Sequence, residues 1–167
     1  MRKETIAYRA ILLVTAIISV MMLVGCAKET EKPEGDVYVL NVGDVEISPG
    51  GEASLIIEKL GKPAFLSREK AGCGSNEIVC VYEYGSFKIK TVNINNRELI
   101  DTVTVTDDML RTSKGITIGS QRKEVISAYG EDFLEYPTGI AYQKGRTTLN
   151  FSIKDDRVVL IYYDYEF

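Results

Sequence analysis

The sequence contains no histidine and no tryptophan, and only three of its 167 residues are cysteine. Without histidine the chain cannot form a Ser-His-Asp triad, a Cys-His pair or a histidine-ligated metal site. These absences exclude a large share of the common enzyme mechanisms. The remaining composition, with 45% hydrophobic and 26% charged residues, is typical of a globular protein rather than a disordered one.

The N-terminal segment predicts export from the cytoplasm. Three basic residues, Arg2, Lys3 and Arg9, precede an apolar run over residues 10–25. This run is shorter than the roughly 20 residues that a membrane-spanning helix needs. The pattern of a basic segment followed by a short apolar run is typical of a signal peptide.

The apolar run ends in Leu-Val-Gly-Cys at residues 23–26, which resembles the lipobox of bacterial lipoproteins. The resemblance implies that residues 1–25 are a signal peptide and that Cys26 carries the lipid. Residues 26–36 are then expected to form a lipid-anchored flexible tether. Two or more acyl chains hold a protein stably on a bilayer, so we expect anchoring at the extracytoplasmic face of the cell membrane. An ordinary signal peptide, or a short anchor with an incidental cysteine, is the alternative.

The net charge of the chain argues against a nucleic-acid partner. Removal of residues 1–25 leaves 17 basic and 23 acidic residues, a net charge of −6. An acidic domain is repelled by phosphate backbones, so we expect no nucleic-acid partner. The acidic excess is too diffuse to define a cationic partner.

The two other cysteines, Cys73 and Cys80, are separated by a short stretch that includes several turn formers. An even number of cysteines outside the cytoplasm predicts a disulfide bond, and two free thiols are the alternative. No C-x-x-C motif is present, and two cysteines without histidine make an incomplete ligand set for zinc. We therefore expect neither a metal nor a cofactor.

An internal repeat is the main architectural signal. Two segments, related by a constant shift along the chain, share a pattern of strand, turn and helix. In both segments the expected helix is followed by a glycine. The matched pairs are Ile47 with Ile116, Gly50 with Gly119 and Gly61 with Gly130. We expect helices over residues 52–60 and 120–129, and Ser120 can cap the second helix. Chance similarity of short patterns is the alternative.

The later parts of the repeat match at a smaller shift. Tyr82 and Gly85 align with Tyr142 and Gly145. In each copy two segments with a strand-like pattern follow. They cover residues 87–94 and 99–106 in the first copy, and 147–153 and 158–164 in the second. Asn-rich and Asp-rich tetrads between these runs predict hairpins. The smaller shift places an insertion around Cys73 and Cys80.

These patterns predict an α+β fold with two tandem helix-plus-antiparallel-strand units over residues 37–108 and 109–167. A single unit is too small for a robust core. Packed side by side, the two units can bury both helices on one face of a sheet. The expected result is a two-layer domain.

The segments at residues 115–130 and 81–91 resemble uncharacterised lipoproteins of clostridia and related Firmicutes. In architecture, the expected fold is similar to the beta-lactamase inhibitory protein and to the small lipoprotein of the outer-membrane barrel-assembly machine. These resemblances imply a sheet surface that meets a protein partner. No motif in the sequence corresponds to the binding loops of the inhibitor.

Two kinds of catalytic pattern occur, and neither is well supported. Ser67 and Lys70 fit the S-x-x-K motif of penicillin-recognising enzymes, but no S-D-N or K-T-G follows, and we expect a solvated loop there. Acidic pairs occur at 107–108, 131–132 and 155–156. Adjacent carboxylates point in different directions, so we interpret these pairs as turn formers.

Tyrosines supply the candidate partner surface, which consists of Tyr82, Tyr84, Tyr163 and Tyr165. Tyrosine is enriched at recognition surfaces because its ring buries a large area while its hydroxyl tolerates water. The alternative is that these rings cover the edge of the core.

Taken together, the patterns favour a non-enzymatic binding or protein-interaction module of the cell envelope. Its partner would be an envelope protein of unknown identity. A hydrolase that uses carboxylates or the Ser-Lys pair is one alternative, and a purely structural envelope component is another.

Overall fold

The computed structural model describes residues 36–70 and 78–167. The first half of the described chain contains β1 (Leu40–Val42), β2 (Val45–Ile47), α2 (Ala53–Leu60), β3 (Phe65–Lys70), β4 (Ile78–Glu83), β5 (Phe87–Ile94) and β6 (Arg97–Val105). The second half contains α3 (Arg122–Tyr129), β7 (Leu134–Tyr136), β8 (Gly139–Lys144), β9 (Thr147–Lys154) and β10 (Arg157–Tyr165). The predicted α+β class is confirmed.

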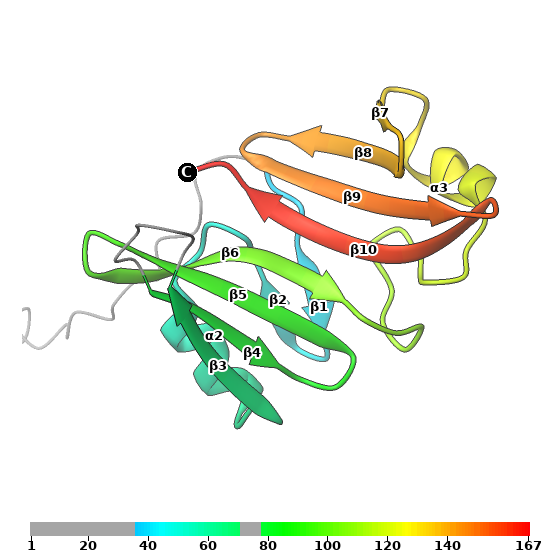
Figure 1. Cartoon of the computed structure of the whole chain (residues 1–167). Helices are drawn as coiled ribbons and strands as arrows, with labels where there is room; N and C mark the ends of the chain where they lie inside the picture. Colours follow the sequence, from blue (N-terminus) through cyan, green and yellow to red (C-terminus); the bar gives the residue numbers. More distant parts are fainter. Residues whose placement is uncertain (1–35, 71–77) are drawn as a thin grey trace, which may run out of the picture.

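One eight-stranded sheet dominates the structure, with the strand order β3-β4-β5-β6-β10-β9-β8-β7 (Figure 1). Every pair of neighbouring strands in this sheet is antiparallel. Strands β3 to β6 come from the first half of the chain and β7 to β10 from the second. The pairing of β6 with β10 therefore joins the two halves into one sheet.

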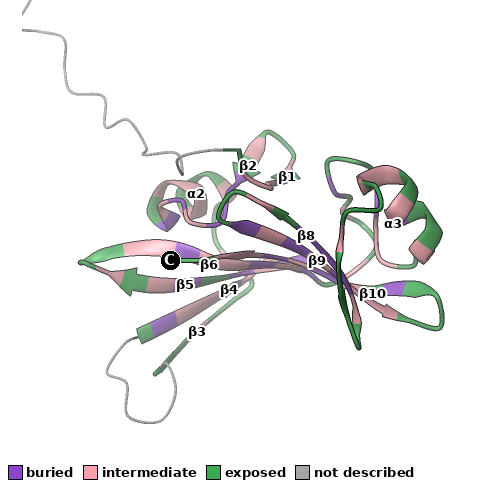
Figure 2. Ribbon diagram, turned by 90° about the horizontal axis from the view of Figure 1, so that it is seen from above, coloured by how far each residue is buried: buried purple, intermediate pink, exposed green. Residues whose placement is uncertain are grey.

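Both helices lie on the same side of this sheet, and the short hairpin of β1 and β2 lies there too (Figure 2). Leu40 and Ile47 of that hairpin are fully buried. The opposite side of the sheet carries no helix among the described residues. We call it the helix-free face.

The two halves follow the same internal register. Tyr82 pairs with Ile89 between β4 and β5, and at the equivalent place in the second half Tyr142 pairs with Leu149 between β8 and β9. The hairpin turns correspond in the same way. Asn95 and Asn96 have φ values of 53° and 61°. Asp155 and Asp156, at the equivalent turn, have 51° and 59°.

Positive φ at both central residues is the requirement of a type I′ hairpin turn, which Asn and Asp tolerate better than other side chains. The hairpins predicted from the Asn-rich and Asp-rich tetrads are thus present. The origin of the two halves by duplication, with a boundary between residues 108 and 109, stays a prediction.

The two helices are short and end at glycine. In α2, Ala53 is buried while Ile56, Ile57 and Leu60 pack against the core from the same helix face. Gly61 then adopts a φ of +77° that side-chain-bearing residues rarely adopt, and its amide donates to the carbonyl oxygen of Ile57 at 3.0 Å.

Helix α3 begins slightly later than the sequence predicts. Gln121, rather than Ser120, is the capping residue, because its backbone amide donates to Glu124 Oε2 at 2.6 Å and completes a capping box. The Ser120 hydroxyl accepts a hydrogen bond from the amide of Thr117 instead. The prediction that Ser120 caps this helix was wrong.

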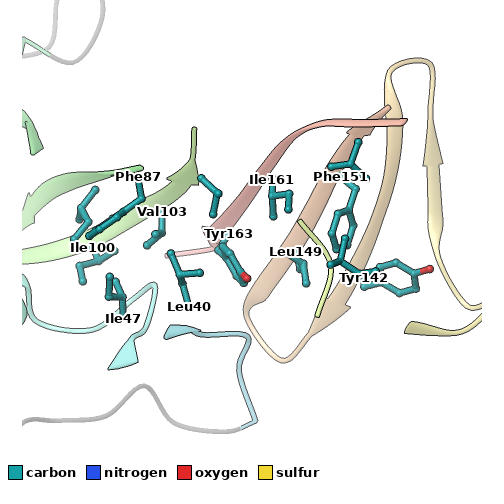
Figure 3. Close-up of a cluster of buried hydrophobic side chains, with 14 of the residues drawn as sticks. Leu40, Ile47, Phe87, Ile100, Val103, Tyr142, Leu149, Phe151, Ile161 and Tyr163 are labelled. Carbon is teal, nitrogen blue, oxygen red and sulfur yellow. The ribbon is translucent and has the colours of Figure 1, made fainter. Parts of the chain in front are cut away.

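The core lies between the sheet and the helices. Its central row crosses six strands and consists of Tyr82, Ile89, Val103, Tyr163, Leu149 and Tyr142. The repeat-related pairs in this row, such as Tyr82 and Tyr142, occupy corresponding places on the two sides of the β6–β10 junction. Phe87 and Phe151 belong to the neighbouring row and fill the two halves of the core (Figure 3).

Among the described residues, no helix is long and apolar enough to cross a membrane. The predicted signal peptide, residues 1–25, the lipidated Cys26 and nearly all of the tether lie outside the described residues. The described chain begins at Asp36, whose Oδ1 lies 2.6 Å from Lys144 Nζ beside the turn between β8 and β9.

Candidate functional site

The four tyrosines of the predicted partner surface lie on the helix-covered side of the sheet. Tyr82 and Tyr163 are only 8% and 1% exposed, and Tyr84 and Tyr165 are half-buried. The register explains this, because Tyr82 and Tyr163 share the central core row. Tyr82 and Tyr163 therefore belong to the core, as the alternative has it, whereas a partner contact through the half-buried Tyr84 and Tyr165 stays a prediction.

Three of these tyrosines make contacts that stabilise the fold. Tyr82 donates its hydroxyl to Glu98 Oε1 at 2.9 Å, and burial together with this bond raises the pKa of the phenol. Tyr84 stacks on Phe87 and donates its hydroxyl to the carbonyl oxygen of Gly61. Tyr165 covers Gly50, where an added Cβ would collide with the tyrosine ring.

The S-x-x-K motif lies on β3, an edge strand, and not in a loop as the sequence predicts. Ser67 pairs with Val81 and Lys70 with Ile78. Residues three apart on a strand point to opposite faces, so the Ser67 hydroxyl and the Lys70 amine are on different sides of the sheet. This arrangement separates a nucleophile from its base.

The acidic pairs do not form a cluster. Asp155 and Asp156 make the hairpin turn between β9 and β10, and Asp107 Oδ1 accepts a hydrogen bond from the amide of Met109 at 2.9 Å in another turn. Among the described residues there is no group of three or more acidic or cysteine side chains that could hold a metal ion. The interpretation of the pairs at 107–108 and 155–156 as turn formers is confirmed.

The predicted disulfide bond stays a prediction. Cys80 lies half-buried on β4 and is a free cysteine in the structure. Cys73 lies outside the described residues.

The helix-free face is built from polar residues that alternate with the core residues along each strand. One row of cross-strand neighbours runs over five strands and consists of Glu83, Lys88, Thr104, Tyr162 and Asn150. A second row consists of Lys90, Thr102, Asp164 and Thr148. This face is continuous across the β6–β10 junction, so side chains from both halves of the chain contribute to it.

Charged groups on this face are mostly paired with one another. Lys88 Nζ lies 2.8 Å from Glu83 Oε1, and Lys90 Nζ lies 2.7 Å from Asp101 Oδ2. Asn150 Nδ2 donates to Asp164 Oδ2 at 3.1 Å. The centre of the face therefore presents hydroxyl, amide and paired charged groups rather than a field of one sign.

A pocket of about 380 Å³ opens on this face near the β7 edge of the sheet. Tyr136 and Thr138 come from β7 and the following turn, while Asn150, Ser152 and Tyr162 come from β9 and β10. A volume of this size falls in the range of small-molecule sites. We refer to it as the β7 pocket.

Strand pairing positions the wall of the β7 pocket, because Tyr136 of β7 pairs with Gly139 of β8. At Gly139 an added Cβ would collide with the carbonyl oxygen of Phe151 on the next strand, so glycine permits the close approach of β8 to β9. Glu135 points to the opposite side of β7 from Tyr136, and its Oε1 lies 3.0 Å from Arg122 of α3 in an exposed ion pair.

Asp164 is the titratable group next to the pocket. Burial raises its pKa above the ordinary value of 3.8, and hydrogen bonds from Thr102 and Asn150 oppose the rise. Burial also raises the pKa of Tyr162, and the neighbouring Asp164 and Tyr136 add to this rise.

The β7 pocket is not predicted from the sequence above, although the alternation of buried and exposed residues in β9 and β10 indicates part of it. Residues 147, 149 and 151 are buried, which leaves Thr148, Asn150 and Ser152 to face the other way. Tyr162 and Asp164 alternate with Tyr163 in the same manner. The contribution of Tyr136 depends on the position of β7, which alternation alone does not reveal.

The hydroxyl groups of two core tyrosines provide a matched test. The Tyr163 hydroxyl is buried and makes no hydrogen bond among the described residues, whereas the Tyr142 hydroxyl donates to the Gly130 carbonyl at 2.8 Å. Tyr142→Phe should lower the free energy of unfolding by about 1 kcal/mol. Tyr163→Phe should leave it unchanged or raise it, as measured by urea unfolding. An equal loss in both variants would contradict the assignment.

The raised pKa of Asp164 predicts that stability depends on pH. Because its pKa is raised in the folded state, the folded chain binds more protons than the unfolded chain just above pH 3.8, and stability falls as pH rises through this window. Asp164→Asn removes this contribution. The free energy of unfolding of the variant, relative to the wild type, should rise between pH 3.5 and about 6. A relative fall over this range would show that the pKa is lowered instead.

Comparisons with known proteins give distant matches to solved structures. No family model matches the chain, and no curated protein matches it. The structure is similar to a DUF4309 family protein (YjgB) from Bacillus subtilis, with 14% identity and a TM-score of 0.40 over 69% of this chain and 78% of that chain. It is also similar to an extracellular protein containing a SCP domain from Bacillus anthracis, with 13% identity and a TM-score of 0.42 over 86% of this chain and 50% of that chain. The resemblance to clostridial lipoproteins stays a prediction.

Proposed function

We propose that this chain is a non-enzymatic binding module of the cell envelope, anchored through a lipid on Cys26, that binds its ligand on the helix-free face. The main support for this proposal is the build of the helix-free face. It spans both halves of the chain, it is not covered by a helix among the described residues, and it contains the β7 pocket. Ligand sites are typically concave and carry a few polar groups that fix orientation.

The charged groups of the face are paired within it. Lys88, Lys90 and Asp164 each have a partner on a neighbouring strand or in the same row. This pairing leaves the hydroxyl and amide groups of the face as the main groups that can orient a ligand. The wide antiparallel sheet holds these groups in place through its backbone hydrogen bonds.

A hydrolase is the rival proposal, and the geometry around the expected residues disfavours it. The Ser67 hydroxyl and the Lys70 amine point to opposite sides of β3. The described acidic pairs at 107–108 and 155–156 lie in turns rather than across a cleft. A nucleophile needs its base within hydrogen-bond reach, and a glycosidase needs two facing carboxylates.

The lipid anchor is a separate prediction. In the producing organism the wild-type protein should be recovered in the membrane fraction, and its mature N-terminal peptide should begin at lipid-modified Cys26 by mass spectrometry. Cys26→Ser should abolish the modification and leave the protein unprocessed or released, because the acyl chains supply the binding energy. An unmodified N-terminus at another residue would contradict the anchor.

The face is tested with two variants that each introduce a glutamate, one on either side of the sheet. Thr104 lies at the centre of the helix-free face, between Lys88 and Tyr162, whereas Ser127 is exposed on α3. Thr104→Glu should reduce binding of the full-length chain to isolated envelope of the producing organism by roughly tenfold or more. Ser127→Glu adds the same charge and should leave binding unchanged.

Circular dichroism and thermal unfolding establish that both variants are folded before binding is compared. Equal binding by wild type, Thr104→Glu and Ser127→Glu would place the ligand elsewhere and overturn the proposal. The same holds if no binding to the envelope is measured for the wild type.

A further inference from the structure

We propose that the β7 pocket binds a neutral saccharide unit, so that the envelope ligand is a glycan. This inference rests on the proposed function, because it identifies the ligand class of the same face. The ring surfaces, the polar groups and the charge of the pocket each favour this ligand class.

Two tyrosine rings line the pocket from different strands. Tyr136 is 49% exposed at the β7 edge, and Tyr162 is half-buried on β10. An aromatic ring offers a flat apolar surface, and a tyrosine adds a hydroxyl at its tip. Sugar rings have apolar C–H faces and polar rims, so they match both parts of such a side chain.

The polar groups of the pocket are available for a ligand. Within the part of the chain that the structure describes, the hydroxyls of Tyr136, Thr138, Ser152 and Tyr162 make no hydrogen bond. The Asn150 side-chain nitrogen is occupied by Asp164 and by the carbonyl oxygen of Thr148, which orients its oxygen as an acceptor. Hydroxyls act as donors and as acceptors, and a saccharide hydroxyl needs partners of both kinds.

The charge of the pocket disfavours other ligand classes. Its lining contains no basic residue to hold a phosphate or a carboxylate, and no acidic residue to hold a cation. The adjacent Asp164 and the net charge of −4 add to the repulsion of anions. A wholly apolar ligand would leave several hydroxyls without partners, which costs free energy for each group removed from water.

The pocket is held in its shape before a ligand arrives. Its β7 wall is held by the backbone pairing of β7 with β8, and the Glu135 carboxylate lies 3.0 Å from Arg122 on the other side of the strand. The Arg122 guanidinium also lies 5.3 Å from the centre of the Phe133 ring, just before β7. A preformed wall loses little conformational entropy when a ligand binds, which matters most for a saccharide because its binding free energy is small.

The test uses the full-length chain in a detergent without a sugar headgroup. Saturation-transfer NMR and calorimetry measure binding of the β-1,4-linked trimer of N-acetylglucosamine, of maltotriose, and of inorganic phosphate. We expect at least one saccharide to bind and phosphate not to bind. Tyr162→Ala and Tyr136→Ala should each weaken saccharide binding about tenfold or more, and Tyr162→Phe should weaken it less because the ring remains.

Phe167→Ala is the matched control, because it removes an exposed ring outside the pocket, at the C-terminal end of the chain. It should leave saccharide binding unchanged. A preference for the N-acetylglucosamine trimer would indicate a wall glycan, and a preference for maltotriose would indicate a neutral glucan; both support the inference.

Three results would overturn the inference: no saccharide binds, phosphate binds in its place, or binding survives both tyrosine-to-alanine variants. The proposed function fails on different evidence. If Thr104→Glu still loses envelope binding while no saccharide binds, the saccharide inference alone is wrong. If the wild type binds neither envelope nor saccharide, both are wrong.

Discussion

The antiparallel pairing of β6 with β10 is the contact on which the rest of the structure depends. It runs from Ile161 opposite Val105 to Asp164 opposite Thr102, and Val103 faces Tyr163 at its centre. Each half alone would have four strands of this sheet and one short helix, too little buried surface for a robust core. Joining them places Leu149 and Ile89 in one buried row, so the hydrophobic free energy of both halves is gained together.

The same pairing determines the chemistry of the other side of the sheet. Side chains alternate across a strand, so a register that buries Val103 and Tyr163 must present Thr102, Thr104, Tyr162 and Asp164 on the helix-free face. A shift of one residue would bury the Asp164 carboxylate and expose Tyr163. Core stability and the composition of the proposed binding face are therefore consequences of one register and cannot change independently.

Much of the fold could be predicted because local signals and tertiary packing agree. Alternation in β9, the glycines after both helices and the Asn-Asn and Asp-Asp turns each specify a local geometry without reference to the rest of the chain. The candidate site was not predictable in the same way. A tyrosine on a strand can face the core or the solvent, and only the β6–β10 register assigns Tyr163 to the core and Tyr162 to the open face. The position of Tyr136 depends further on the pairing of β7 with β8, where Tyr136 lies opposite Gly139.

The described chain starts against the second half of the sheet. Asp36 contacts Lys144, and the Tyr38 amide donates to Thr147 Oγ1 at 2.8 Å, so the described chain begins at the end of the sheet where β8 turns into β9. Confinement to a membrane raises the effective concentration of a weak binder near envelope ligands. If the β7 pocket binds single saccharide units, as proposed, confinement would add to its effect, because many contacts with a polymeric glycan could then act together.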